Sequence, residues 1–131
     1  LENPYVTPYW LLRRGVHEKD WSYFQVGVRR RFSLAEALSL SLDYQVEFGN
    51  RRHLLVRYGE IDDGSDYSDG IQSSIFKVQV GWQALEWCEI FAGVHQFDVL
   101  SSRGREACAE HNACCGRADL TVGVLGCRLN F

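Results

Sequence analysis

A strict alternation of apolar and polar residues at positions 38–48 constrains the fold of this chain more than any other feature. The even positions carry Leu, Tyr, Val or Phe, and the odd positions carry Ser, Asp, Gln or Glu. A period of two is that of a β-strand with two unlike faces. The odd face is too polar for a dry protein core, because every buried polar group there would need a partner. The segment is also about as long as a tilted strand that crosses the hydrocarbon layer of a bilayer.

Five further segments have strand character, and several alternate in the same way. In residues 21–32, Phe24 and Val26 share one face, whereas Arg29 and Arg31 share the other. The pattern predicts an all-β, antiparallel, up-and-down protein. Its six strands are expected at residues 5–14, 21–32, 38–48, 71–82, 87–99 and 119–131.

The connections between these strands alternate in length, with two short ones among longer ones. They are expected at residues 15–20, 33–37, 49–70, 83–86 and 101–118. A short β segment at residues 54–58 would bring the number of strands towards eight. Outer-membrane barrels have short periplasmic turns and longer outer loops, with the C-terminus on the periplasmic side. If the chain ends at Phe131 on that side, both short connections fall there as well.

Composition narrows the class of partner. The 131 residues suit one domain, residues 1–131, and the net charge is −3 with basic and acidic residues interspersed. Nucleic-acid binding needs a basic surface, so we expect no nucleic acid among the partners. No run of 18 apolar residues occurs, which excludes a transmembrane helix but not a barrel, whose strands alternate.

Four stretches share their pattern with a known group of proteins. They read N-P-Y at residues 3–5, W-S-Y-F-Q-V-G-V at 21–28, F-S-L followed by L-S-L-S-L within 32–42, and D-L-T-V-G-V-L-G-C-R-L-N-F at 119–131. Together they are similar to the C-terminal half of a large group of uncharacterised bacterial outer-membrane β-barrel proteins. The resemblance implies a barrel of about eight to twelve antiparallel strands. It supplies no catalytic residues to carry over. We expect no cofactor.

Six strands are fewer than such a barrel needs. We therefore expect the chain to be a fragment, the C-terminal part of a larger transmembrane barrel in the bacterial outer membrane. The lipid bilayer is its expected partner. Other chains, or an outer-membrane complex, would complete the wall.

Charged residues gather on the polar faces of the predicted strands, where a barrel would enclose them. In a narrow lumen opposite charges must pair or stay hydrated, because an unpaired charge in a dry space is costly. We favour a network of salt bridges that fills the lumen, with a selectivity-lining pore as the alternative. The residues expected to line the lumen are Arg29, Arg31, Asp43, Glu47, Lys77, Glu89 and Arg128.

Three of the five cysteines, Cys108, Cys114 and Cys115, lie in the last long connection. Their spacing does not match the common zinc motifs, so we expect no metal there. A disulfide from Cys108 to Cys114 or Cys115, in an oxidising compartment, is the favoured interpretation. Cys88 and Cys127 are expected near the other ends of their strands, too far away to join it.

Nothing in the sequence favours catalysis. His95 lies in a strand, and Ser73 and Ser101 are conceivable nucleophiles, but no serine lies in a G-x-S-x-G or comparable signature. A lone histidine in a strand is more often a hydrogen-bonded structural residue. The acidic segment 62–69 lacks the closing glutamate of a calcium-binding EF-hand loop and is interpreted as a solvated turn. We expect no enzyme; the third possibility, a hydrolase acting on membrane lipid or peptide, would need a convergent His–Ser or His–Asp pair at the outer mouth.

The sequence thus predicts an outer-membrane β-barrel protein with a structural or passive-transport role. The alternative is a soluble, secreted β-barrel or sandwich that binds a ligand or a protein partner. The soluble protein would bury its apolar rows against one another. The membrane protein would expose them as an outer belt about 25 Å tall, with aromatic residues at its rims. Trp10, Trp82 and Phe131 are the expected rim residues.

Overall fold

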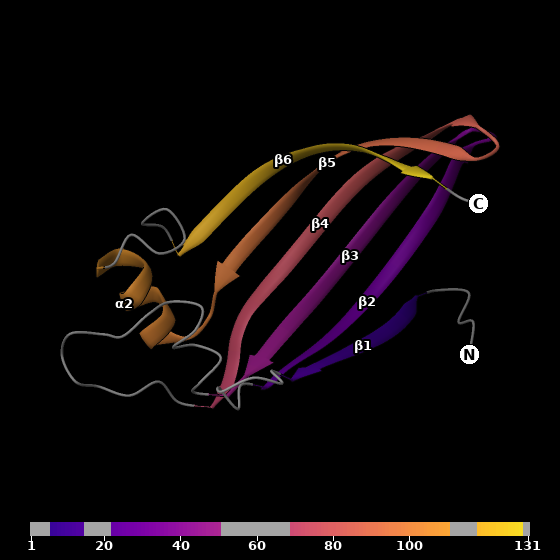
Figure 1. Cartoon of the computed structure of the whole chain (residues 1–131). Coiled ribbons are helices and arrows are strands. Elements are labelled where there is room, and N and C mark those ends of the chain that lie inside the picture. Colours follow the sequence, from indigo (N-terminus) through magenta and orange to yellow (C-terminus); the bar gives the residue numbers. More distant parts are fainter. Residues whose placement is uncertain (1–5, 15–21, 51–68, 111–117, 130–131) are drawn as a thin grey trace.

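The computed structural model describes residues 6–14, 22–50, 69–110 and 118–129, which form one antiparallel sheet and one helix. Figure 1 shows six long strands side by side, in the order β1-β2-β3-β4-β5-β6. The elements are β1 (Thr7–Arg14), β2 (Ser22–Ala35), β3 (Leu38–Gly49), β4 (Gly70–Leu85), β5 (Cys88–Val99), α2 (Ser102–Glu110) and β6 (Asp119–Leu129). The predicted all-β, antiparallel, up-and-down arrangement is confirmed.

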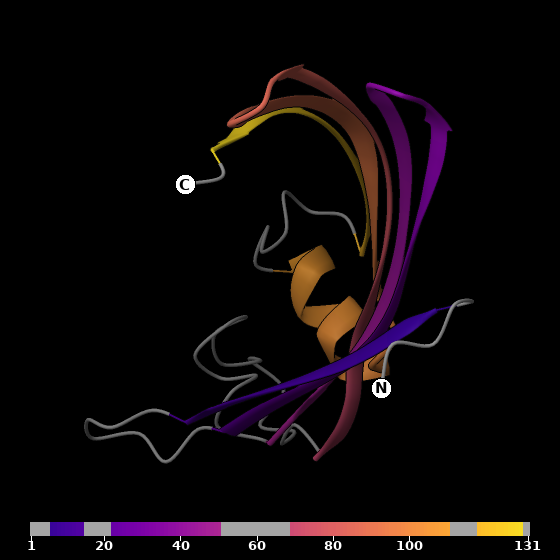
Figure 2. The same ribbon diagram turned by 90° about the vertical axis from the view of Figure 1, so that its right-hand side faces the viewer.

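The sheet is strongly curved but open. Each strand pairs with its neighbours in sequence, and β1 and β6 form the two edges without pairing to each other. Figure 2 shows the resulting trough, with a gap between the two edge strands. The closed barrel of the sequence prediction is therefore not formed by the described residues. The short β segment predicted at residues 54–58 lies outside them.

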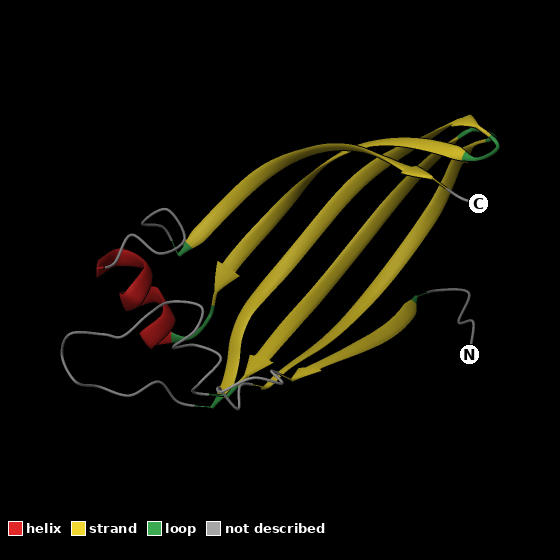
Figure 3. Ribbon diagram, in the orientation of Figure 1, coloured by secondary structure: helices red, strands yellow, loops and turns green. Residues whose placement is uncertain are grey.

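Both short connections are tighter than predicted. β2 continues to Ala35 and β4 to Leu85, so the turns consist of residues 36–37 and 86–87. In each hairpin the strand pairing has a register shift just before the turn. Because of this shift, residues that were predicted to lie in the loop remain paired. The two turns lie at one end of the sheet (Figure 3), where Gln83 N donates a hydrogen bond of 2.8 Å to Ala37 O.

The opposite end of the sheet carries α2, where the sequence predicted only a loop. Ser101 precedes the helix, and its Oγ accepts a hydrogen bond of 3.2 Å from Gly104 N, which is an N-cap. Arg105 donates to the carbonyl of Val99 and to the carboxylate of Asp119, so α2 is fastened to the end of β5 and the start of β6. Figure 2 shows α2 on the concave side of the sheet. No helix in the described part of the chain is long and apolar enough to cross a membrane.

The two faces of the sheet differ in polarity, and the polar side chains are the more buried ones. The buried hydrophobic residues are few, and apart from Ile75 they lie in or beside α2. Most buried side chains are polar: Gln25, Ser39, Asp43, Gln45, Glu47, Gln72, Ser73, Ser74 and Glu89. Large apolar residues are exposed instead, among them Trp10, Leu12, Phe24, Val26, Val28, Tyr44, Phe76, Val80, Trp82, Ile90, Val94, Leu125 and Leu129.

The polar face is the concave one. Arg31 of β2 binds Glu89 of β5, three strands away, at 2.5 Å. Neighbouring strands lie about 4.8 Å apart, so side chains three strands apart meet only across the inside of a curve. The apolar rows consequently cover the convex face.

Candidate functional site on the concave polar face

The strand register places four ionisable side chains in one row across the trough. Arg29 of β2 lies opposite Asp43 of β3, Asp43 opposite Lys77 of β4, and Lys77 opposite His95 of β5. All four are at the parity that points to the concave side, because Asp43 is buried and its partners line the same pocket. The alternation of the sequence thus produces a charged band across the middle of the sheet.

Asp43 is the carboxylate of this band, with 5% of the residue exposed. Its Oδ2 accepts from Arg29 Nε at 2.7 Å, and its Oδ1 accepts from the hydroxyl of Tyr9 at 2.6 Å. Tyr9 lies against Gly27, where a Cβ atom would come within 2.3 Å of the Tyr9 ring. The glycine therefore provides the space through which an edge-strand tyrosine reaches β3.

Towards the α2 end, amides and hydroxyls continue the network around a second carboxylate. Glu47 accepts hydrogen bonds from the hydroxyls of Tyr23, at 2.5 Å, and of Ser73. The Oε1 atom of Gln45 accepts from Gln25 Nε2 at 2.6 Å and from Lys77 Nζ at 3.0 Å. Neutral groups satisfy much of the buried polar surface here.

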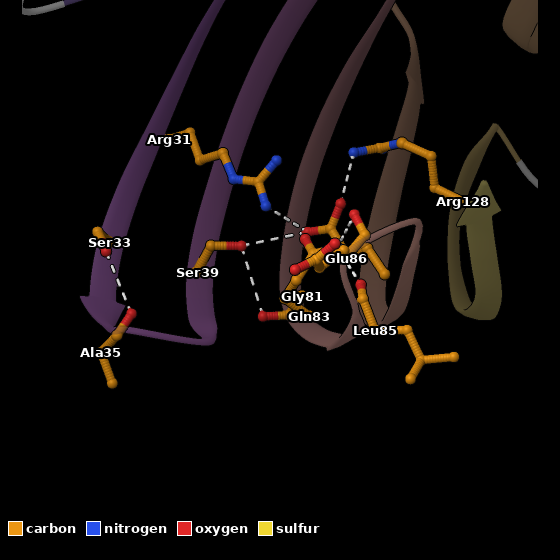
Figure 4. A network of polar contacts seen from close by, with 10 residues as sticks. Arg31, Ser33, Ala35, Ser39, Gly81, Gln83, Leu85, Glu86 and Arg128 are labelled. Atoms are coloured by element: carbon orange, nitrogen blue, oxygen red, sulfur yellow. Dashed lines mark hydrogen bonds and ion pairs between the residues drawn. The ribbon is translucent and has the colours of Figure 1, made fainter. Parts of the chain in front are cut away.

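Towards the turn end, Glu89 is held from two sides. Figure 4 shows Arg31 and Arg128 reaching towards the same point from β2 and β6. Arg31 binds Glu89 Oε1 at 2.5 Å, and Arg128 binds Oε2 at 3.0 Å. Ser39 Oγ lies 3.3 Å from Oε1. Gly81 leaves room for the carboxylate, since a Cβ there would lie 2.1 Å from Oε1.

A pocket of about 220 Å³ opens between these networks. Its lining contains four permanent cations and, among the described residues, a single carboxylate. The lining residues are Arg29, Arg31, Ser41, Asp43, Lys77, Gln79, His95 and Arg128. Glu89, which binds Arg31 and Arg128 just outside the lining, offsets part of this positive charge. The pocket still has a surplus of positive charge, although the chain as a whole is acidic.

All seven residues predicted to line a lumen lie in these networks, and five of them line the pocket itself. That they line a closed lumen stays a prediction, because the sheet is open. Tyr9 was not among them. Its side-chain direction becomes evident only from the register that sets it opposite Gly27, a pairing that the weak alternation of β1 does not reveal.

The disulfide prediction is not tested, because residues 114 and 115 lie outside the described part of the chain. Among the described residues no disulfide is formed. Cys108 is fully buried in α2, and Cys88 and Cys127 lie near the turn end of β5 and β6. The separation of these two cysteines from Cys108 agrees with the sequence prediction.

The candidate nucleophiles are occupied by structural hydrogen bonds. Ser73 donates to Glu47, and Ser101 caps α2. His95 Nε2 lies 3.1 Å from Gln79 Nε2, within the pocket lining. Within the described ranges, no group of three or more His, Cys, Asp and Glu side chains is placed to hold a metal ion.

Comparison of the chain with models of protein families, with curated proteins and with solved structures finds no match.

Proposed function

We propose that this chain forms part of the wall of a transmembrane β-barrel in a bacterial outer membrane, with a structural or passive-transport role. The observation that carries the proposal is the inversion of the two faces. Apolar rows cover the convex face, and ion pairs and amide networks occupy the concave face. A bilayer solvates the first kind of face, and a hydrated lumen suits the second.

The strand length supports the same proposal. β3 contains 12 residues, which at about 3.3 Å per residue and a tilt of about 45° span roughly 28 Å along the membrane normal. This height is close to the apolar band of about 25 Å found in outer-membrane barrels.

Aromatic residues lie near both limits of the apolar face. Phe24 and Phe48 are paired at the α2 end, with ring centroids 6.1 Å apart. Trp82 and Trp87 lie at the turn end, each about half exposed. Of the three expected rim residues, Trp82 lies at the turn end of the apolar face, and Trp10 lies opposite Val26, one apolar row from the α2 end; residue 131 is outside the described residues.

The open edges fit a wall that is completed by other strands. Along β1 and β6 one row of backbone groups has no strand partner among the described residues. In lipid each unsatisfied backbone group costs several kcal/mol, so such an edge has to be closed. We infer that strands from elsewhere, in the same polypeptide or in another chain, pair with β1 and β6.

Most of the charged residues on the concave face serve structure in this proposal. Asp43 is bound by two side chains and Glu89 by three, which suits a network that stabilises the wall. The pocket leaves space beside them for a small solute. The soluble alternative, a secreted β-protein that binds a ligand, would instead bury its apolar rows, and these are exposed.

The test is the behaviour of the purified full chain towards detergent and lipid. We expect partition into the detergent phase, heat-modifiable migration on a gel, and quenching of tryptophan fluorescence by brominated acyl chains, because Trp10 and Trp82 are exposed on the convex side. A chain that stays monodisperse and monomeric without detergent would refute the membrane proposal and favour the soluble alternative.

A further inference from the structure

We propose that the pocket on the concave face binds a small oxyanion, a phosphate or a carboxylate, between Arg29, Lys77 and Arg128. This inference deepens the proposed function and rests on it for its biological meaning, because a lumen with such a site would favour the passage of anions. Binding itself requires the curved sheet but not the bilayer.

The first reason to infer anion binding is that the arginines of the pocket have hydrogen-bond donors that no carboxylate of the described residues uses. Arg29, Arg31 and Arg128 each use one nitrogen on a carboxylate among the described residues: Nε on Asp43, and Nη2 and Nη1 on Glu89. A guanidinium has five N–H donors in a planar fork, so most of these donors remain for a ligand.

The second reason is the ammonium group of Lys77, which is bound to a neutral amide. Within the described part of the chain this ammonium group donates to the neutral Gln45 Oε1 at 3.0 Å and forms no ion pair with a carboxylate. Lys77 also lies in register between Asp43 and His95, at the centre of the charged row. A strongly hydrated ammonium ion that faces a pocket without its own counter-ion is a ready partner for an anion.

The positions of the cations and the volume of the pocket favour a small oxyanion as the ligand. The cations come from β2, β4 and β6, so an anion among them would join strands that are not neighbours. The volume of about 220 Å³ equals that of roughly seven water molecules in the liquid, enough for one oxyanion with part of its hydration shell. The surplus of positive charge disfavours a cation.

The guanidinium groups are also accessible. The side chains of Arg29, Arg31 and Arg128 are 58%, 49% and 51% exposed, whereas the carboxylates that they bind are almost fully buried. An anion can therefore reach the cations without displacing Asp43 or Glu89.

The experiment is a calorimetric titration of the full chain in uncharged detergent micelles at low ionic strength. Inorganic phosphate is the ligand in one arm, and succinate is the ligand in the other. We expect saturable binding of at least one of the two, and the tighter one identifies the class of anion. Affinity should fall as sodium chloride is added, because the ions are partly exposed.

Lys77→Gln should weaken the binding about tenfold, the effect of one lost charge-assisted hydrogen bond. Lys77→Arg, which keeps the charge, should restore most of it. The matched control is Arg30→Gln. This substitution also removes one positive charge, but from the apolar row of β2 and not from the pocket. There Arg30 stacks on Phe32, at 4.5 Å from the ring centroid. This control should change the affinity less than twofold.

A second variant keeps the proposal testable if Lys77→Gln fails to fold. Ser41→Asp adds a carboxylate to the pocket lining and should abolish binding. The proposal is overturned if the folded wild-type chain binds neither anion saturably, or if Arg30→Gln weakens binding as much as Lys77→Gln does. Anion binding by a chain that does not enter lipid would refute the membrane proposal alone, and membrane insertion without anion binding would refute this inference alone.

Discussion

The buried carboxylates on the concave face are bound by side chains that themselves reach solvent. Glu89 is 4% exposed, whereas the side chains of Arg31 and Arg128 are about half exposed. The cost of breaking this cluster should therefore depend on which partner is removed. Without the two arginines, the buried carboxylate keeps only the Ser39 hydroxyl among the side chains described as bound to it, whereas a half-exposed guanidinium can turn to water.

From this asymmetry we predict that Arg31→Gln combined with Arg128→Gln lowers the free energy of unfolding by about 3–5 kcal/mol. Glu89→Gln should lower it by only about 1 kcal/mol, because both guanidinium groups become hydrated. Urea unfolding of the full chain in detergent micelles measures the two values. A larger loss for Glu89→Gln than for the double variant would contradict the argument.

At this scale the sequence was a good guide where alternation is strict and a poor one where it is not. Asp43 and Glu47 lie in the cleanest pattern of the chain, and both lie on the predicted polar face. The role of Tyr9 could not be predicted, because it depends on Gly27, the residue opposite it on the neighbouring strand β2. Long-range register of this kind is not encoded in a local period.

Among the elements, α2 differs most from the sequence prediction. Its segment is short, polar and contains a glycine, so it shows no apolar stripe of the usual kind. Its stability comes from the Ser101 cap, the Arg105 contacts and the burial of Ala107 and Cys108. Of these, only the cap leaves a signal in the sequence, a serine three residues before Gly104.

We therefore predict that Ser101→Ala destabilises α2 locally by about 1 kcal/mol, which corresponds to a roughly fivefold faster amide exchange in the helix. Ser102→Ala is the matched control, because Ser102 is exposed and adjacent but is not the capping residue. Hydrogen exchange followed by mass spectrometry compares the two. Equal acceleration in both variants, or acceleration that spreads through β3 and β4, would refute a local cap.

The strand ends were predicted to within two residues, apart from the C-terminal ends of β2 and β4, which lie three residues further on. The sequence placed loops at residues 33–37 and 83–86, where the ladder instead continues through a register shift. A bulge adds one residue to a strand without ending the pairing. The alternation of apolar and polar residues is therefore broken although the strand continues. Periodicity alone ends a strand too early in such a place.

At the scale of the whole molecule, the environment of the convex face decides between the two functions. Leu125 is 81% exposed and pairs with Ala92 in the middle part of β6 and β5. In a soluble protein an arginine at so exposed a position changes stability by less than about 0.5 kcal/mol. At the midplane of a bilayer the same arginine costs about 2–4 kcal/mol.

We predict that Leu125→Arg lowers the stability of the chain in lipid vesicles by about 2–4 kcal/mol. Leu125→Phe, which keeps the position apolar, should leave stability nearly unchanged. Urea titrations in vesicles, followed by tryptophan fluorescence, provide the measurement. If the arginine and phenylalanine variants unfold at the same urea concentration, the convex face does not contact acyl chains.

Closure of the sheet was the least predictable property of the whole molecule. Alternation fixes which face of a strand is apolar, but the number of strands that complete a circle depends on pairing between distant segments. Six strands leave β1 and β6 as edges. No property of these strands taken singly determines what lies beside them.

The neighbour-to-neighbour order of the strands has a consequence for how a sheet of this kind gains or loses strands. In the described part of the chain every ladder joins two strands that follow each other in sequence, so none of the six strands is inserted between two that precede it. A hairpin such as β2–β3 or β4–β5 is consequently a self-contained module. Duplication or deletion of one module would change the number of strands in the sheet by two and leave all remaining pairings as they are.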